Sequence, residues 1–394
     1  MRLSHRLRGC GYASALALLT ARGLGAQGTA LADEGAFLIR LGRDTVAVER
    51  FKIAGSTLEG ELVLRSPSTV IRRFSATLGP DGTLTRAQWT NHAPNAPATA
   101  PPRSSGTATV GTDSVTVETR QGDSTRIRRI VTRPGLLPLI FPGFAGLQLA
   151  VQRFRQLARD SATVNMYFLG GVQQVEMSVK RAAPDTVHVQ HLVGLFELKV
   201  DSAGRVVGAR APRSTFQVMV ERLRSVDLQT IATRWAAADT AGRGLGQLSP
   251  RDTVTAAVAG ANLWIDYSRP QKRGREVFGG VVPWGQVWRT GANSATQFRS
   301  DRDLTIGSAT IPAGTYTLWT LPTQQGWKLI VNKQTGQWGT EYDPAQDLVR
   351  VDMTTERLPS TLEQFTIAIE TQRQGALLKL AWDRTQASVV MRVK

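Results

Sequence analysis

Apolar and polar residues alternate along most of the first half of the chain. Runs such as FLIRLG from Phe37, TVAVERFKIAG from Thr45 and TLEGELVLRS from Thr57 place apolar side chains at every second position, the period of a strand with one buried face. Gly, Asp and Pro separate the runs, as at residues 42–44 and 79–82, and these residues favour tight turns. The pattern predicts a curved antiparallel sheet over residues 27–222.

One stretch inside this region has a helical period instead. Phe144, Leu147, Val151 and Phe154 recur at spacings of three and four, with Gln and Arg between them, which predicts an amphipathic helix over residues 144–159. The helix has two interpretations. It covers the sheet as part of the core, or it is a lid over a lipid-like cavity, an arrangement that resembles the periplasmic lipoprotein carriers in topology alone.

The second half of the chain is predicted to form a separate domain. Residues 223–255 form a linker, in which Asp227 is a good N-cap for a short helix and Gly242, Gly244 and Gly246 follow it. From residue 256 the apolar runs are short and turn residues separate them, as is typical of a β-sandwich, of which the jelly roll is one form. The fold class is therefore mostly β, with a sandwich over residues 256–394.

The first 26 residues have the composition of a secretory signal peptide. Arg2, Arg6 and Arg8 precede an apolar run that ends in small residues before Gln27. The run is too short for a membrane span, which needs roughly 20 apolar residues. We therefore expect an exported protein, periplasmic or extracellular, without a transmembrane segment. Its single cysteine, Cys10, would leave with the signal.

The chain is basic, with a formal net charge of +17. The arginines are dispersed and no nucleic-acid-binding motif accompanies them, so nucleic acid is not expected as a partner. In an exported protein, the positive charge either keeps the protein soluble or attracts it to anionic envelope polymers and lipid head groups. Small molecules, envelope polysaccharides and lipids remain as partner classes.

The residue inventory limits the possible chemistry. Residues 256–394 contain no His and no Cys, which excludes a Ser-His-Asp triad, a Cys-His pair and a histidine metal site within them. His188 and His191 fall on opposite faces of a predicted strand, which argues against a shared metal. No catalytic residue, cofactor or metal is predicted. A carboxylate-dependent hydrolase remains an alternative, with four candidate acids: Asp266, Glu276, Asp343 and Asp383.

Aromatic and planar polar side chains gather in the second half of the chain. Trp and Tyr offer flat faces with a polar edge, and Arg and Asn offer forked donors, as in carbohydrate or carboxylate pockets. The alternative is that the Trp side chains fill the core and the Arg pairs with an internal acid. The predicted ligand-binding residues are Trp284, Trp288, Arg289, Asn293, Tyr316 and Trp338.

Three motifs in this half are SRPQKRGREVFGG, VPWGQVWRTGAN and AGTYTLW. Through them, about residues 261–394 resemble the bacterial DUF2911 family, a domain of unknown function. The resemblance implies an exported bacterial setting and brings no assigned catalytic residues. The sequence thus predicts a non-enzymatic ligand-binding protein of the envelope or periplasm, with a hydrolase acting on a carbohydrate-like substrate and a lipid-carrier-like envelope protein as alternatives.

Overall fold

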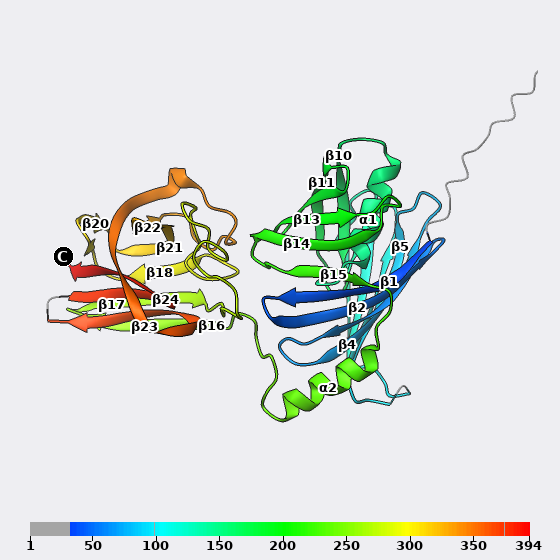
Figure 1. Ribbon diagram of the computed structural model, residues 1–394, viewed down its shortest axis with the longest axis horizontal. Helices are drawn as coiled ribbons and strands as arrows, with labels where there is room; N and C mark the ends of the chain where they lie inside the picture. Colours follow the sequence, from blue (N-terminus) through cyan, green and yellow to red (C-terminus); the bar gives the residue numbers. More distant parts are fainter. Residues whose placement is uncertain (1–31, 98, 374) are drawn as a thin grey trace, which may run out of the picture. The chain divides into compact units, whose positions relative to one another are not determined.

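The computed structural model describes residues 32–97, 99–373 and 375–394 (Figure 1). The signal peptide predicted at residues 1–26 lies outside them. The described chain is mostly β with large sheets, which confirms this part of the predicted fold class. Its strands form two hydrogen-bonded sheets, one of fifteen strands and one of nine.

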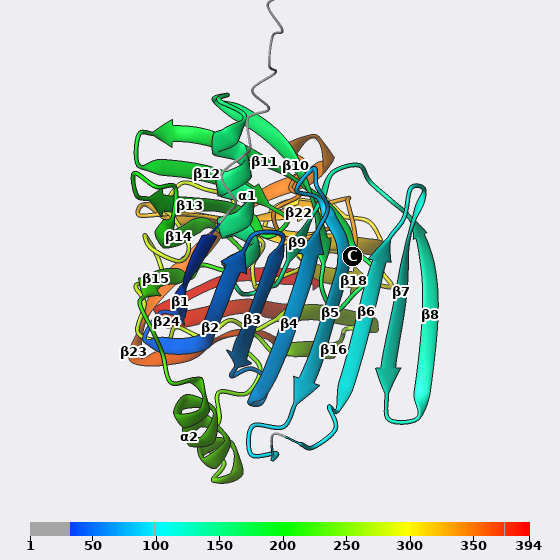
Figure 2. The ribbon, with the colours of Figure 1, turned by 90° about the vertical axis from the view of Figure 1, so that its right-hand side faces the viewer.

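The larger sheet contains every strand between residues 32 and 223. Its order is β8-β7-β6-β5-β4-β3-β2-β1-β15-β14-β13-β12-β11-β10-β9, so most neighbours in the sheet are neighbours in sequence (Figure 2). All pairs are antiparallel except β9 with β10. The strands are β1 (Ala32–Leu41), β2 (Asp44–Ala54), β3 (Thr57–Leu64), β4 (Val70–Leu78), β5 (Leu84–His92), β6 (Ser104–Val110), β7 (Ser114–Gln121), β8 (Ser124–Val131), β9 (Leu136–Leu139), β10 (Ser161–Phe168), β11 (Gln174–Ala183), β12 (Thr186–His191), β13 (Gly194–Val200), β14 (Val206–Ser214) and β15 (Met219–Leu223).

Helix α1 (Ala145–Gln156) packs into the main core of this sheet. Phe144, Leu147 and Phe154 are almost fully buried there, as the period predicts. Two details of the prediction were wrong. The helix ends at Gln156, with Leu157 as an exposed C-cap, and Gln152 on the expected polar face is buried.

A carboxylate from another strand caps the first turn of α1. Glu49 on β2 is fully buried, and its Oε2 accepts hydrogen bonds from the backbone N–H groups of Phe144 at 2.6 Å and Ala145 at 3.0 Å. The N-cap residue Phe144 has no capping side chain of its own. An anion at a helix N-terminus satisfies N–H groups that lack partners within the helix. Burial nevertheless raises the pKa of Glu49 to about 7, and the hydrogen bonds oppose that shift.

Helix α2 (Leu228–Thr240) packs on the opposite face of the same sheet. The predicted N-cap is confirmed, because Asp227 accepts from the N–H of Thr230 at 3.0 Å. Trp235 and neighbouring apolar residues of α2 form a small core with Val48 and Val63. The helix in the predicted linker is therefore packed against the fifteen-stranded sheet.

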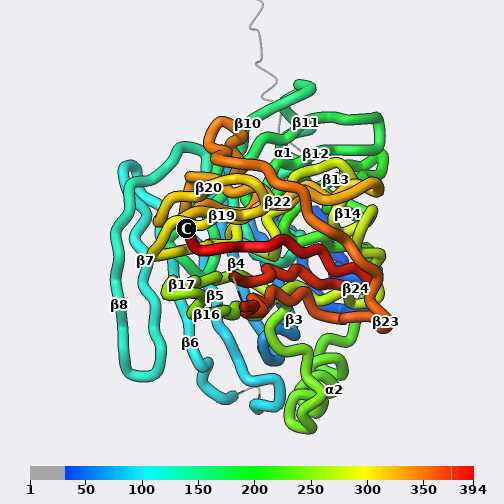
Figure 3. The backbone as a smooth tube through the Cα atoms, turned by 90° about the vertical axis from the view of Figure 1, so that its left-hand side faces the viewer, coloured from blue at the N-terminus to red at the C-terminus, as the bar shows by residue number. Residues whose placement is uncertain are grey.

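The nine-stranded sheet contains the strands after residue 250, in the order β16-β17-β18-β21-β22-β23-β24-β19-β20. The apolar runs from residue 256 are short, yet the last two strands, β23 and β24, are long, and they lie side by side (Figure 3). Register shifts near Leu362 and a positive φ at Asp383 accommodate the bends without ending the strands. The strands are β16 (Arg251–Val258), β17 (Ala261–Ser268), β18 (Thr296–Ser300), β19 (Leu304–Ile306), β20 (Ala309–Ile311), β21 (Gly314–Thr323), β22 (Gly326–Asn332), β23 (Asp347–Gln372) and β24 (Gly375–Val393), and a short 3₁₀ helix spans Pro344–Gln346.

The buried capping carboxylate predicts a pH dependence. A folded-state pKa above the ordinary value means that the neutral form of Glu49 favours folding below about pH 4.5, and that this stability is lost as the pH rises through about 7. Glu49→Gln cannot ionise, so its free energy of unfolding relative to wild type should rise by roughly 2–3 kcal/mol between pH 4.5 and pH 8. Urea denaturation checks this. Exposed Glu59→Gln is the control, and an equal difference at both pH values would contradict the prediction.

The hydrophobic clusters suggest where the chain divides. One set of clusters draws its residues from 37–248 and the other from 254–393. We propose on this basis that residues 251–394 fold alone. The isolated fragment should show a β-type circular dichroism spectrum and a cooperative thermal transition, and a fragment that stays unfolded would show that the two sheets depend on each other.

Candidate functional site

The candidate site begins with one tightly held loop, residues 288–296. Trp288 exchanges two backbone hydrogen bonds with Thr320 of β21, at 2.8 and 2.9 Å. The hydroxyl of Thr296 donates to the carbonyl of Thr290 at 2.7 Å, and the N–H of Ala292 donates to the carbonyl of Ser268 at 3.2 Å. The loop is therefore fixed at both ends and in the middle.

Two residues of this loop have an unfavourable backbone conformation. Thr290 has φ of 52° and Asn293 has φ of 60°. A β-branched residue such as Thr rarely adopts a positive φ, and such conformations persist only where surrounding contacts impose them, often at functional sites. Thr290 is fully buried. The contacts that hold the loop also fix the backbone of Arg289, which lies between Trp288 and Thr290.

A second loop, residues 334–342, lies against the first. The N–H of Gly339 donates to the carbonyl of Asn293 at 2.9 Å, and the N–H of Ala295 donates to the carbonyl of Gln337 at 3.2 Å. Ser294 and Trp338 form an isolated antiparallel bridge. The structure thus brings together three of the predicted residues, Arg289, Asn293 and Trp338.

The side chain of Arg289 passes directly over Gly339. A Cβ atom at position 339 would collide with Cδ of Arg289 and with the carbonyl oxygen of Asn293, so only glycine leaves this passage open. Arg289 is half-buried, and its Nε has no solvent contact and no hydrogen-bond partner. Burial lowers the pKa of Arg289 to about 10.

Among the described residues, the guanidinium of Arg289 has neither an ion pair nor a hydrogen bond. Other shielded arginines do have partners: Arg222 lies 2.6 Å from Asp33, and Arg273 lies 2.7 Å from Asp44. The sequence left two alternatives for Arg289, an open pocket or an internal ion pair. The structure shows a third state, a shielded cation to which no carboxylate is paired.

Further polar atoms near this loop lack partners. The Nε1 of Trp338 and the Oε1 atoms of Gln334 and Gln337 are buried without a hydrogen bond in the described chain. Buried polar groups are nearly always paired, and each exception requires an explanation. Two donors and two acceptors without a protein partner, all from loops 288–296 and 334–342, are groups to which a polar ligand could form hydrogen bonds.

The other predicted residues lie apart from this group. Trp288 stacks on Trp382 with ring centroids 6.0 Å apart and belongs to the core of the nine-stranded sheet. Tyr316 is in the same core, and its hydroxyl donates to the carbonyl of Pro312 at 3.0 Å. Trp284 is 37% exposed and lies beside Phe278. Their part in ligand binding stays a prediction, and packing already accounts for Trp288 and Tyr316.

The candidate acids of the hydrolase alternative have structural partners. Asp266 pairs with Arg251, and Asp383 pairs with Lys272 at 2.6 Å. Asp343 accepts from the N–H of Ala345 at 2.9 Å and so caps the 3₁₀ helix. These contacts account for three of the four acids, and Glu276 has no contact that indicates a catalytic pair.

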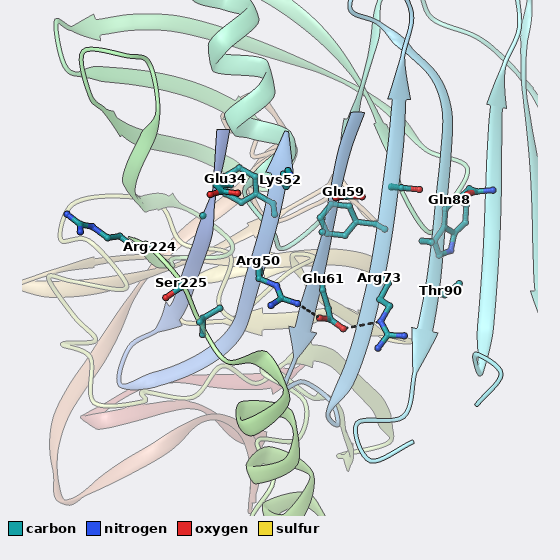
Figure 4. Close-up of a pocket in the computed structure, with 17 residues that line it drawn as sticks. Glu34, Arg50, Lys52, Glu59, Glu61, Arg73, Gln88, Thr90, Arg224 and Ser225 are labelled. Carbon is teal, nitrogen blue, oxygen red and sulfur yellow. Dashed lines mark hydrogen bonds and ion pairs between the residues drawn. The ribbon is translucent and has the colours of Figure 1, made fainter. Parts of the chain in front are cut away.

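Sequence reasoning missed a hollow of about 760 Å³ on the sheet of residues 32–223. Arg50, Glu61 and Arg73 lie side by side in it on β2, β3 and β4, with Glu61 3.2 Å from Arg50 and 3.1 Å from Arg73 (Figure 4). Alternating charges on neighbouring strands stabilise a sheet by cross-strand pairing. Cross-strand pairing therefore explains the charged residues of the hollow without a ligand. No signal in the sequence indicates the hollow, because outward-facing charges alternate in the same way on any solvent-exposed sheet face.

A metal-binding cluster and a membrane-spanning helix each have a characteristic pattern of residues. The part of the chain that the structure describes contains no group of three or more His, Cys, Asp or Glu side chains placed to hold a metal ion, and none of its helices combines the length and the apolar character that a membrane span requires. His191 is buried, which lowers its pKa to about 4, and its Nδ1 accepts from the N–H of Val193 at 3.3 Å.

Residues 249–391 match the family model described as "Protein of unknown function (DUF2911)". The match confirms the resemblance drawn from the motifs. No curated protein matches the sequence. A crystal structure of a DUF1089 family protein from Pseudomonas aeruginosa is similar at 14% identity, with a TM-score of 0.31 over 42% of this chain and 90% of that chain. This likeness is too distant to support an argument about the fold or the site.

The state of Arg289 predicts an unusual stability effect. Arg289→Met removes a half-buried cation without leaving a carboxylate unpaired, so the free energy of unfolding should stay the same or rise by about 1 kcal/mol. Arg222→Met is the matched control, because it leaves the buried Asp33 unpaired and should destabilise by about 3–5 kcal/mol. Urea denaturation of both variants measures the difference. Equal destabilisation by the two substitutions would show that Arg289 has an internal partner.

Proposed function

We propose that this is an exported, non-enzymatic bacterial ligand-binding protein whose C-terminal domain holds a carboxylate or phosphate group at Arg289. The observation that carries the proposal is the half-buried guanidinium of Arg289, which has no protein partner in the described chain and whose Nε is shielded from solvent. The ligand is a small molecule or a portion of an envelope polysaccharide that carries such a group.

The energetics favour an anion at this place. A desolvated cation costs free energy unless an opposite charge and hydrogen bonds compensate it. A guanidinium binds carboxylate and phosphate through two parallel hydrogen bonds, which gives both strength and orientation. An arriving anion would supply the partner that Arg289 lacks in the described chain. The unfavourable free energy of the unpaired cation in the free protein would then be relieved on binding, which strengthens the affinity for the anion.

The surrounding loops support recognition beyond the charge. Trp338 offers an unpaired Nε1 donor, and the amides of Gln334 and Gln337 offer acceptors. Sugar hydroxyls both donate and accept hydrogen bonds, so a mixed set of this kind suits a polyhydroxylated ligand. The strained loop 288–296 holds Arg289 in position before the ligand arrives, which limits the entropy lost on binding.

The two alternatives are less well supported. A lipid carrier needs space beneath α1, whereas Phe37, Phe144 and Phe196 pack against one another there, with centroids 5.9 Å apart in both pairs. A hydrolase needs paired free carboxylates, whereas most of the candidate acids are engaged in structural contacts.

The proposal includes the finer assignments. We assign residues 256–394, which contain most of the nine-stranded sheet, to a sandwich, because β23 pairs with β22 along one part of its length and with β24 along the other. Export rests on the signal-like residues 1–26. The mass of the mature protein from its native host tests export, and retention of Met1 would contradict it.

Binding is tested with three probes: glucuronate, inorganic phosphate and uncharged glucose. Isothermal titration calorimetry should show that at least one anionic probe binds to wild type more tightly than glucose does. Arg289→Met should abolish this binding, and Trp338→Phe, which keeps an aromatic ring but removes the N–H group, should weaken it about tenfold.

Arg299→Met provides the matched control. Arg299 is an exposed arginine of β18 that lies over the ring of Trp264, and its loss should leave binding unchanged. Equal binding of glucose and the anions, or anion binding that survives Arg289→Met, would contradict the assignment of an anion site to Arg289.

A further inference from the structure

The outermost strand of the fifteen-stranded sheet has no neighbour on one side. β8 pairs with β7 and stands at the end of the strand order. Seven of its eight residues are exposed, and Ile127 and Val131 are exposed by 66% and 83%. Exposed edge strands offer unpaired N–H and C=O groups to other chains, and natural proteins usually cover, shorten or interrupt them. β8 is as long as most strands of the sheet and has no bulge.

The register shows which backbone groups of β8 are free. A two-residue turn at Gly122 and Asp123 joins β7 to β8, with Gln121 opposite Ser124. In such a hairpin the residues that flank the turn form a hydrogen-bonded pair, and every second pair after it does so too. Ser124 and the even-numbered residues therefore bond to β7. The odd-numbered residues, Ile127 and Arg129 among them, direct N–H and C=O away from the sheet.

The side chains of β8 are basic and apolar. Its sequence STRIRRIV contains Arg126, Arg128 and Arg129, and none of the three has an ion pair within the described residues. Arg126 and Arg128 lie on one face of the strand and Arg129 on the other, because successive side chains alternate. Ile127 and Val131 share the face of Arg129. A partner strand would thus meet positive charge on both faces and apolar surface on one.

Charge decides between two occupants of this edge. A second copy would pair β8 with β8 in antiparallel fashion, with odd-numbered residues opposite odd-numbered residues. Centred on residue 126, 127, 128 or 129, every such register places one arginine directly opposite another, and like charges opposite each other destabilise a sheet. An acidic side chain opposite any one of the three arginines has the opposite effect.

We propose that β8 is a docking edge at which an extended acidic segment of another protein adds a strand to the sheet. Backbone hydrogen bonds to the odd-numbered residues supply affinity, and side-chain charge supplies selectivity, as in other cases of strand addition. The segment alternates acidic residues with Val or Ile, so that apolar side chains contact Ile127 and Val131. The interaction is independent of the anion site at Arg289.

The test uses full-length protein and a blocked nine-residue peptide of alternating Val and Glu, labelled with a fluorophore. Anisotropy should show binding that falls at least tenfold when alternate peptide nitrogens are methylated, because methylation removes the hydrogen bonds of one edge. A peptide of alternating Val and Lys should not bind. The doubly substituted Arg126→Glu/Arg128→Glu protein should prefer the Lys peptide to the Glu peptide.

The control variant is Arg86→Glu, which reverses an exposed charge on the interior strand β5 and should leave binding unchanged. Circular dichroism confirms that each variant is folded. The proposal is overturned if folded wild type does not bind the Glu peptide, if methylation has no effect, or if binding follows total charge alone and Arg86→Glu weakens it equally. Dimerisation that Arg126→Glu/Arg128→Glu abolishes would identify a second copy as the occupant and would also overturn it.

Discussion

The contact between Glu49 and the first turn of α1 is the interaction on which the larger sheet depends. It places an ionisable carboxylate in a core that is otherwise aromatic and aliphatic, and it connects β2 to the helix that this core surrounds. The first turn of α1 has backbone N–H groups that require acceptors. Since no local side chain supplies one, the apolar face of α1 can be buried only where Glu49 reaches it. The close approach of Gly143 to Glu49, where a Cβ atom would collide with the carboxylate, is a part of the same arrangement.

Glu49 and Arg289 are both charged groups that burial disfavours, and they differ in what surrounds them. Glu49 has two N–H donors, so its role in the fold is evident from its contacts. Arg289 has no partner in the described residues, and the loop that holds it contains a strained Thr290. Neither the cation nor the strain helps the protein to fold. A feature that opposes folding and is nevertheless firmly positioned is more readily explained by binding than by stability.

The sequence predicted what depends on local pattern. Alternation in β1 to β4, the N-cap at Asp227 and the helical period from Phe144 to Phe154 are signals contained in short windows, and the structure confirms them. It could not predict that Glu49 caps α1, because the two are 95 residues apart. Nor could it separate Trp288 in the core from Trp338 at a loop, since both are tryptophans in stretches rich in glycine and polar residues. The short apolar runs did not predict the length of β23 and β24, because register shifts allow these strands to continue through polar residues.

The arginines of this chain occur in three environments that differ in burial and in pairing. Arg222 is shielded, paired with Asp33 and placed over the rings of Phe37 and Phe51, so it acts as part of the core. The arginines of β8 are exposed and keep their hydration, so they cost little and act on whatever approaches the edge. Arg289 lies between these settings, shielded as Arg222 is but unpaired as the β8 arginines are. An anion would give a partner to Arg289 or to the β8 arginines, but the β8 arginines would lose hydration in exchange, whereas the Nε of Arg289 has none to lose.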